Sequence, residues 1–475
     1  MASFSNVSNF NLLGLTALLT VLFASGAGKQ KDVEYKDITF IVMSQPNSFH
    51  AKRAHLLKED FEKQIKQLNL KGDDRPGLYL LHETKGLPSL GVWTLFPVFS
   101  VFPDVFPSTP WVFFCEEETR IKLPKLLNLL TRFDSSKNVF LGRGLHDAQI
   151  SIIHHFYGSD DPGAFAFPDL RAGFLLSQPL VARLAEMMKD LPGADLNSID
   201  FNIDPKHEFA RYLLEKLDTS LTELTELCVL DSEDCATYDN LKFPQCGAAI
   251  PDEDLSVAVK TCGKFHADRV PVVKKTWSQE SSNIEYFSDV DDPSIPTITL
   301  GVPNTERGHC GKTMAIIRRA AEKKEFADKK WLLIADDDTI ISLQKLRLML
   351  ACYDASEDIA LGERYGYMSA RGYGYDYITG GGGMLFSWPL LKQLAKECTC
   401  PSDDSPDDMI LGMCLKRMGI TITHSPYIHQ ARMEDYSADF LKHRSHVSFH
   451  KHWDSDPVAT YKFLQTDVTS KHDEL

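Results

Sequence analysis

The sequence predicts an α/β protein built from two tandem units, and three observations support this prediction. The chain has 475 residues, of which 43% are hydrophobic and 25% charged, so it is long enough for two or three domains with real cores. Short apolar runs bounded by turn residues alternate with segments of helical periodicity. Three sequence blocks also recur in the same order in both halves of the chain.

The recurring blocks define the two units. They are WVFFCEEET (111–119) and WLLIADDDT (331–339), LGR (141–143) and LGE (361–363), and AGFLLSQPL (172–180) and GGMLFSWPL (382–390). Residues 231–254 are rich in acidic residues, proline and glycine, which is typical of a connecting segment. We therefore expect one unit over 29–250 and a second over 251–471.

The expected elements follow in order along each unit. Buried strands are predicted at 38–43 and 111–114 in the first unit and at 298–300 and 331–335 in the second, because each is a short apolar run. A helix is predicted where Met314, Ile317 and Ala321 share one face. Each acidic triplet follows a strand directly, and ligand sites of open α/β sheets lie at the carboxyl ends of strands.

Both ends of the chain carry address signals. The apolar run at 12–24 is shorter than the ~20 residues needed to span a bilayer, and it indicates a signal peptide over 1–28 rather than a buried N-terminal helix. Residues 472–475 read HDEL, an ER-retrieval signal. We expect a protein of the endoplasmic reticulum lumen that binds the retrieval receptor and has no membrane span after signal cleavage.

Charge and cysteine content narrow the classes of partner. The 66 Asp and Glu outnumber the 51 Lys and Arg, and a net charge of −15 disfavours binding to nucleic acid or to an anionic membrane surface. The ten cysteines all follow the signal segment, so an oxidising compartment predicts disulfides, mainly among the nine from Cys228 onward. Spacing alone leaves their connectivity open.

Acidic residues of the second unit are candidates for a chemical role. The Asp336–Asp338 triplet follows an apolar strand, and adjacent carboxylates are stable together when a hard divalent cation holds them; a solvated turn is the alternative. Asp407 and Asp408 precede an apolar helical run, where one of them could cap the helix or act as a general base. The glycines at 380–383 could let the backbone approach a ligand or bend a strand.

Histidines of the second unit allow two interpretations. His424 and His429 follow a strand-like segment, and each is a metal ligand or a polar core residue. The histidines at 443, 446, 450 and 452 have no cysteine partners and no HExxH pattern, so no structural zinc is predicted there. The sequence GKT at 311–313 fails as a phosphate-binding loop because position 306 is Glu306 and not glycine.

Taken together, these motifs resemble the fringe-like family of inverting glycosyltransferases. The resemblance runs in order through WLLIADDDT (from 331), LGERYGY (from 361), YITGGGGMLFS (from 377), SPDDMILGMCL (from 405) and HSPYIHQAR (from 424). It implies two GT-A-like, Rossmann-type units. The first unit departs from the family pattern, since glutamates replace the aspartate triplet at 116–118, and it is expected to be a degenerate, non-catalytic repeat.

The resemblance also implies roles for single residues. Asp408 would be the general base. A divalent cation, usually Mn²⁺, would be held by Asp336, Asp338 and His429. The donor would be contacted by Asp336, Asp337, Gly381, Gly382 and Gly383.

The activity that the resemblance implies is transfer of glucose in β-1,3 linkage from UDP-glucose to O-linked fucose on thrombospondin type 1 repeats. Two alternatives are a related β-1,3 transferase that uses UDP-galactose or UDP-N-acetylglucosamine, and a non-catalytic sugar-binding chaperone of the endoplasmic reticulum. The physical properties of the residues do not select the sugar.

Overall fold

A computed structural model describes residues 33–87, 91–158, 160–196, 200–240, 242–324, 328–451 and 455–466. The expected signal peptide and retrieval signal lie outside the described residues. The chain from Val33 onward forms one compact unit that contains both halves. In this part of the chain, no helix is both long and apolar enough to cross a membrane.

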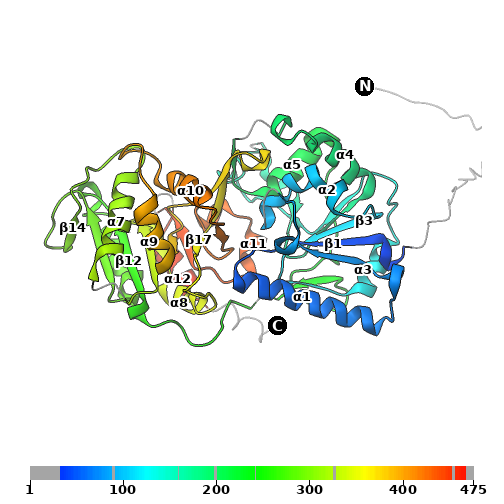
Figure 1. Ribbon diagram of the computed structural model, residues 1–475, viewed down its shortest axis with the longest axis horizontal. Helices are drawn as coiled ribbons and strands as arrows, with labels where there is room; N and C mark the ends of the chain where they lie inside the picture. The colour runs from blue at the N-terminus through cyan, green and yellow to red at the C-terminus, as the bar shows by residue number, and fades with distance from the viewer. Residues whose placement is uncertain are drawn as a thin grey trace, which may run out of the picture. The chain divides into compact units, whose positions relative to one another are not determined.

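The first half contains a six-stranded sheet in the order β2-β1-β3-β8-β5-β10 (Figure 1). Strands β1, β2 and β3 run parallel, and β8 runs antiparallel to both of its neighbours. The elements of this half are β1 (Ile38–Val42), α1 (Ser48–Gln67), β2 (Gly77–Leu80), α2 (Pro97–Val105), β3 (Trp111–Cys115), β4 (Thr119–Ile121), α3 (Leu123–Leu130), β5 (Phe140–Gly142), β6 (Gly144–Leu145), β7 (Phe167–Pro168), β8 (Phe174–Ser177), α4 (Gln178–Met188), β9 (Phe201–Asn202), α5 (Pro205–Leu217), β10 (Thr222–Glu223) and β11 (Thr237–Asp239).

The second half contains a seven-stranded sheet in the order β14-β13-β12-β15-β20-β17-β21. Its elements are β12 (Leu255–Lys260), α6 (Val270–Lys275), β13 (Ile284–Ser288), β14 (Thr297–Thr299), α7 (Cys310–Glu322), β15 (Trp331–Asp336), β16 (Thr339–Ile341), α8 (Leu343–Leu350), β17 (Ala360–Gly362), β18 (Arg364–Tyr367), β19 (Tyr375–Ile378), β20 (Met384–Ser387), α9 (Trp388–Glu397), α10 (Asp407–Met418), β21 (Thr423–His424), α11 (Ala438–Lys442), β22 (Ser448–His450) and α12 (Pro457–Gln465).

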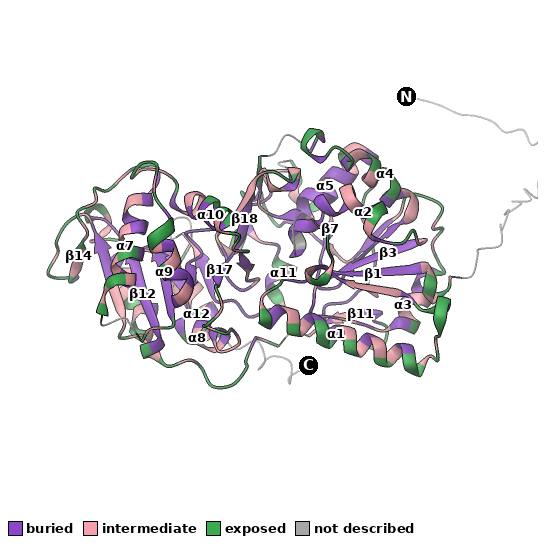
Figure 2. Cartoon of the chain, viewed as in Figure 1, coloured by how far each residue is buried: buried purple, intermediate pink, exposed green. Residues whose placement is uncertain are grey.

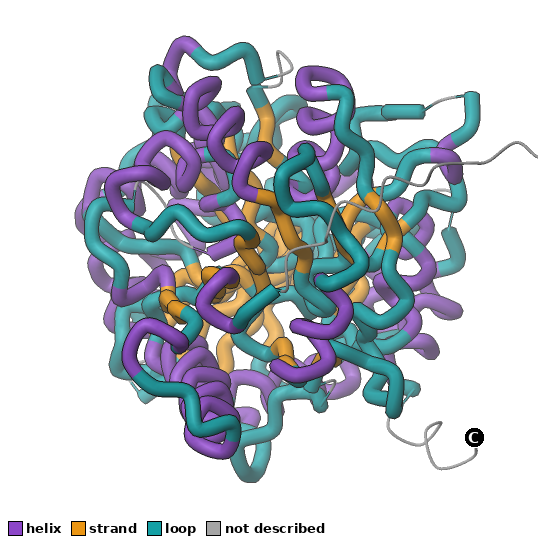
Figure 3. The backbone as a smooth tube through the Cα atoms, turned by 90° about the vertical axis from the view of Figure 1, so that its right-hand side faces the viewer, coloured by secondary structure: helices purple, strands orange, loops and turns teal. Residues whose placement is uncertain are grey.

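The prediction of an α/β fold is confirmed, and the two sheets share one strand order. β2-β1-β3-β8-β5-β10 corresponds strand by strand to β13-β12-β15-β20-β17-β21, and in both sheets the fourth strand is antiparallel to its neighbours. The central strands are apolar along their whole length because helices cover both faces of each sheet. Figure 2 shows these strands as buried, and Figure 3 shows helices around the strands.

Successive side chains of each strand point to opposite faces of the sheet and therefore pack against different helices. In the first sheet, Phe40 packs with α1 and α3, whereas Ile41 packs with α2, α4 and α5. In the second sheet, Val257 packs with α6 and α8, and Ala258 packs with α7, α9 and α10. The predicted helix face is confirmed in part, since Met314 and Ile317 of α7 are buried.

The two halves are joined by a sheet and by a disulfide. β9 of the first half pairs antiparallel with β18, which in turn pairs with β19 of the second half. Cys246 forms a disulfide with Cys352. The other disulfides are Cys228–Cys235, Cys310–Cys400 and Cys398–Cys414, and the free, buried cysteines are Cys115 and Cys262. Disulfides among the cysteines from Cys228 onward were predicted, and eight of those nine form them.

Candidate active site

The Asp triplet lies at the carboxyl end of β15 and lines a cleft of about 540 Å³. β12 and β15 are parallel neighbours, and their register places Lys260 opposite Asp336 at the last position of both strands. The cleft is lined by Lys260, Thr261, Cys262, Lys264, Phe265, Arg269, Asn304, Thr305, Glu306, His309, Lys312, Asp336, Asp337, Asp338 and His450. It therefore combines acidic and basic side chains in one concave surface.

Two basic side chains reduce the repulsion within the triplet. The buried Lys260 Nζ lies 3.0 Å from Asp336 Oδ1, and Arg269 Nη1 lies 3.0 Å from Asp337 Oδ1 and 2.9 Å from Asp338 Oδ2. Burial nevertheless raises the pKa of Asp337 to about 6, although hydrogen bonds from Thr261 and Arg269 oppose the shift. The Asp337 carboxylate thus bonds to Thr261 and Arg269, whereas the carboxylates of Asp336 and Asp338 face His450.

His450 completes a group of three possible metal ligands with Asp336 and Asp338. Its Nε2 lies 3.0 Å from Asp338 Oδ1, and the ligand atoms of all three residues lie within 4.8 Å of one another. The pairing of β16 with β22 sets this position, since it places His450 opposite Thr339. Two carboxylates and one imidazole suit a divalent cation such as Mn²⁺ or Zn²⁺. Gly381 is needed beside them, because an added Cβ would lie 2.2 Å from His450 Nδ1.

The structure does not bring His429 to the triplet, and this corrects the predicted ligand set. His446 Nε2 lies 3.0 Å from the Leu441 carbonyl, which can only accept, so His446 Nδ1 accepts in turn from His429 Nε2 at 2.8 Å. The His429 ring is buried and stacks on Phe449. The His429 Nε2 atom is therefore used in the core. Its partner His446 lies two residues before β22, the strand that carries His450.

Asp407 and Asp408 are the first two residues of α10, and their different environments give them different pKa values. Asp407 accepts from Lys260 Nζ and from Thr313 Oγ1, each at 2.6 Å, and these groups outweigh burial and hold its pKa at about 2. Burial and the negative charge of Asp407 raise the pKa of Asp408 to about 7, against hydrogen bonds from the Met409 and Gly380 amides. Of these two aspartates, only Asp408 can therefore exchange a proton near neutral pH.

The residues predicted to contact the sugar-nucleotide donor lie in two different places. Asp336 and Asp337 line the cleft. The glycines instead turn the chain between β19 and β20: the Gly382 amide donates to Gln430 Oε1 at 3.0 Å, and Gly383 has a positive φ of 102° that favours glycine. Among the described residues that line the cleft, none of Gly381, Gly382 and Gly383 appears. Their role in donor binding stays a prediction.

Each glutamate of the triplet in the first half faces a basic side chain of the protein itself. His50 Nδ1 lies 2.5 Å from Glu117 Oε1, and Arg53, also on α1, forms an ion pair with Glu118. Glu116 Oε2 lies 3.9 Å from Arg444 of the second half. Basic side chains thus lie where a cation would need to bind. The degenerate, non-catalytic role of the first half stays a prediction.

This arrangement predicts that Glu118→Gln destabilises the protein. Arg53 is largely buried and would lose its partner, and breaking a buried ion pair on one side costs about 3 kcal/mol. The free energy of unfolding, measured by urea denaturation, should fall by that amount. The matched control is Glu186→Gln, because the Glu186–Lys189 pair is exposed and its loss should cost at most about 0.5 kcal/mol. Equal stability of the two variants would contradict the assignment.

Sequence reasoning missed several residues of the site. Lys260 and Arg269 were not selected, although a lysine that ends an otherwise apolar strand is a recognisable signal. His450 was set aside with its neighbouring histidines. Lys312, from the rejected phosphate-loop match, is buried beside the cleft and donates to the Thr261 carbonyl at 2.7 Å.

Comparison with known proteins identifies the family. The profile of the Fringe-like family matches residues 33–194 and again residues 250–470. The protein named beta-1,3-glucosyltransferase from Homo sapiens is 48% identical over 442 residues, which cover 92% of this chain and 86% of the human protein. The Mus musculus protein of the same name is 47% identical, and the match covers 90% of this chain and 86% of the mouse protein. Manic fringe from Danio rerio, named as a beta-1,3-N-acetylglucosaminyltransferase, is 28% identical over 37% of this chain and 55% of its own length. The protein therefore belongs to the Fringe-like family.

Proposed function

We propose that this protein is a metal-dependent, inverting hexosyltransferase of the endoplasmic reticulum lumen that transfers glucose in β-1,3 linkage from UDP-glucose to O-linked fucose on thrombospondin type 1 repeats. One observation carries the proposal. Lys260 forms ion pairs both with Asp336, one of the three possible metal ligands, and with Asp407, whose neighbour Asp408 has a pKa of about 7. The names of the human and mouse relatives support the sugar and the linkage.

The donor would bind in the cleft beside the triplet. Lys264, Arg269 and Lys312 supply positive charge there, which suits a nucleoside diphosphate. Asp336, Asp338 and His450 would hold the cation, in place of the set with His429. A divalent cation at this point offsets the negative charge that develops on the leaving diphosphate.

The residues around α10 would activate the acceptor. The Asp408 carboxylate would take the proton of the fucose 3-hydroxyl, and the hydroxyl oxygen would attack the anomeric carbon from the face opposite the diphosphate. Asp407 would stay ionised against Lys260, and its charge keeps Asp408 basic enough for this step. A single displacement of this kind inverts the anomeric configuration.

Activity should depend on pH through Asp408. Its carboxyl must be deprotonated to act, and its pKa is about 7, so kcat/KM should fall about tenfold per pH unit below 7 and level off above it. The measurement is kcat/KM over roughly pH 5 to 8.5 at saturating Mn²⁺. A profile that stays flat between pH 5 and 7 would contradict the role of Asp408.

The test of the proposed function is a donor panel against one acceptor. UDP-glucose, UDP-galactose and UDP-N-acetylglucosamine are each incubated with Mn²⁺ and an O-fucosylated thrombospondin type 1 repeat, and the product is identified by mass spectrometry. Transfer of glucose alone supports the proposal, and transfer of another sugar supports the related transferase. No transfer from any donor, together with binding of the glycosylated repeat, would support the chaperone instead.

A further inference from the structure

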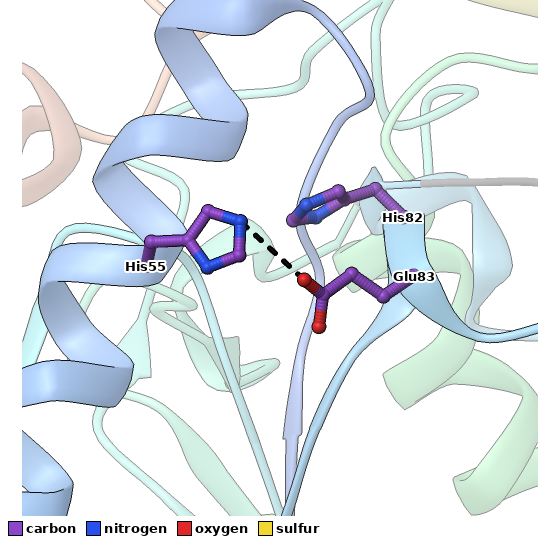
Figure 4. A group of neighbouring side chains, drawn as sticks. All are labelled: His55, His82 and Glu83. Atoms are coloured by element: carbon purple, nitrogen blue, oxygen red, sulfur yellow. Dashed lines mark ion pairs between the residues drawn. The ribbon is translucent and has the colours of Figure 1, made fainter.

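A surface group of two histidines and a glutamate lies outside the candidate active site. It consists of His55 of α1 with His82 and Glu83 from the turn after β2, and Figure 4 shows the three side chains pointing toward one another. His55 Nε2 lies 3.4 Å from Glu83 Oε1, and Lys58 donates to the same carboxylate at 3.2 Å. An ordinary surface network of ion pairs accounts for this group, so no metal site is inferred from it.

The three-stranded sheet that joins the two halves carries a row of aromatic side chains. Its register places Tyr367 of β18 opposite Phe201 of β9 on one side and opposite Tyr375 of β19 on the other. Residues directly opposite each other in antiparallel strands lie on the same face of the sheet. The ring of Tyr367 accordingly lies 5.2 Å from that of Phe201 and 5.7 Å from that of Tyr375, measured between centroids. We call these three residues the aromatic platform.

The aromatic platform is open to solvent at the end that belongs to the first half. Phe201 is 41% exposed, whereas Tyr367 and Tyr375 are half-buried. Met413 of the neighbouring helix α10 is 49% exposed, and it lies one turn after Met409, which packs in the same apolar cluster as Tyr367 and Tyr375. Exposed apolar side chains that gather in one place mark a binding surface more often than scattered ones do.

The other end of the aromatic platform lies beside the candidate base. Met409, the residue after Asp408, shares an apolar cluster with Tyr375 and Tyr377. Helix α10 packs directly on β19, since a Cβ added at Gly412 would lie 2.5 Å from the Cβ of Tyr377. Burial, and next the negative charge of Asp408, raises the pKa of Tyr377, which agrees with this proximity. The row of rings therefore extends from the surroundings of Asp408 to the surface of the first half.

The two aspartates at the start of α10 connect to different surfaces. Asp407 accepts from Lys260, which lines the donor cleft, whereas Asp408 is followed by Met409 in the cluster of the platform. Among the described residues that line the cleft, no member of the aromatic platform occurs. A single displacement needs the acceptor on the face of the anomeric carbon opposite the leaving diphosphate. The aromatic platform is thus placed on the side from which an acceptor would approach Asp408.

We propose that the aromatic platform binds the protein part of the acceptor, beside the fucosylated residue. The fucose itself must lie at Asp408, and the row then continues over two strand spacings, about 10 Å, which is longer than one sugar ring. Ring faces pack well against apolar and basic side chains, so a folded domain that carries such side chains around its fucose is the expected occupant. The inference rests on the proposed transferase function and assigns the first half, through Phe201, a part in acceptor recognition.

The experiment compares a folded acceptor with a small one in the full chain. Phe201→Ala and Tyr367→Ala remove one ring each, and Phe201→Tyr and Tyr367→Phe keep the rings. Leu56→Ala is the matched control, because Leu56 is another exposed apolar side chain of the first half and lies on α1, outside the platform. Binding of an O-fucosylated thrombospondin type 1 repeat is measured by surface plasmon resonance without donor. Values of kcat/KM are measured for the same repeat and for p-nitrophenyl fucoside, and circular dichroism checks that each variant is folded.

We expect the repeat to bind at least about tenfold more weakly to Phe201→Ala and to Tyr367→Ala, as is usual when an aromatic side chain at the centre of an interface is removed. The ratio of kcat/KM for the repeat to kcat/KM for the fucoside should fall by a similar factor. The ring-keeping variants and Leu56→Ala should bind the repeat like the unmodified protein.

The two readouts separate the platform from the proposed function. Absence of transfer to both acceptors would contradict the transferase activity, whereas binding tests the platform without any transfer. The platform proposal is overturned if the unmodified protein does not bind the repeat, or if folded Phe201→Ala and Tyr367→Ala bind it as tightly as the unmodified protein does. An equal loss of binding in Leu56→Ala would also contradict it.

Discussion

Asp408→Asn should lower turnover by about 10²–10⁴-fold, which is the usual contribution of a general base. Asn cannot accept the proton of the acceptor hydroxyl, but it keeps nearly the same shape at the start of α10 and can still accept from the Met409 amide. Stability should therefore change by at most about 1 kcal/mol. UDP binding, measured by titration calorimetry in Mn²⁺, should be unchanged because the cation set lies outside α10.

The neighbouring carboxylate provides the control for this experiment. Asp407→Asn removes the negative charge that helps to raise the pKa of Asp408, so the midpoint of the pH profile should move to lower pH while turnover above it persists. It also leaves the buried Lys260 with one carboxylate fewer, so this variant should be the less stable of the two. Full turnover in Asp408→Asn together with loss in Asp407→Asn would move the base assignment by one residue.

His450→Ala should abolish measurable transfer at low Mn²⁺, with a loss of at least about 10²-fold in apparent Mn²⁺ affinity. The side chain offers the only imidazole in the group with Asp336 and Asp338, and a methyl group cannot replace it. The measurement is the dependence of turnover on Mn²⁺ concentration, supported by direct Mn²⁺ titration. Asp338→Ala should behave in the same way.

His429→Asn separates the two candidate histidines. Asn can still donate to His446 Nδ1, so the core contact is partly kept, and Mn²⁺ affinity should stay close to that of the unmodified protein. Some loss of stability is expected, because the buried ring that stacks on Phe449 is removed. A variant at 429 that loses Mn²⁺ affinity, beside a variant at 450 that keeps it, would restore the ligand set predicted from sequence.

The parts of the site that sequence could predict are those carried by local pattern. An apolar strand that ends in three aspartates places its charges at the edge of a sheet, whatever the rest of the chain does. The Asp407–Asp408 pair is likewise predicted from the pattern of a helix start, because it forms the first two residues of α10. The internal repeat predicted two similar units, and the shared strand order of the two sheets agrees with it.

The parts that sequence could not predict depend on pairing between distant segments. His450 reaches the triplet only because β22 pairs with β16, more than a hundred residues earlier, and several other histidines compete for the same interpretation. Lys260 acquires its partners from β15 and α10. Burial and the charge of Asp407 raise the pKa of Asp408, whereas Lys260 and Thr313 lower that of Asp407, so these acidities too required the three-dimensional arrangement.

The contact made by Arg444 has a consequence for biosynthesis. Arg444 lies 3.2 Å from the buried Asp239 and 3.9 Å from Glu116, so the first half buries carboxylates whose partner belongs to the last part of the chain. At about 5–20 residues per second, a ribosome needs roughly 10–40 s to travel from Asp239 to Arg444. During this interval the first half emerges with an acidic interior that lacks its counter-charge. Its final packing must therefore wait until the segment that contains Arg444 has been synthesised.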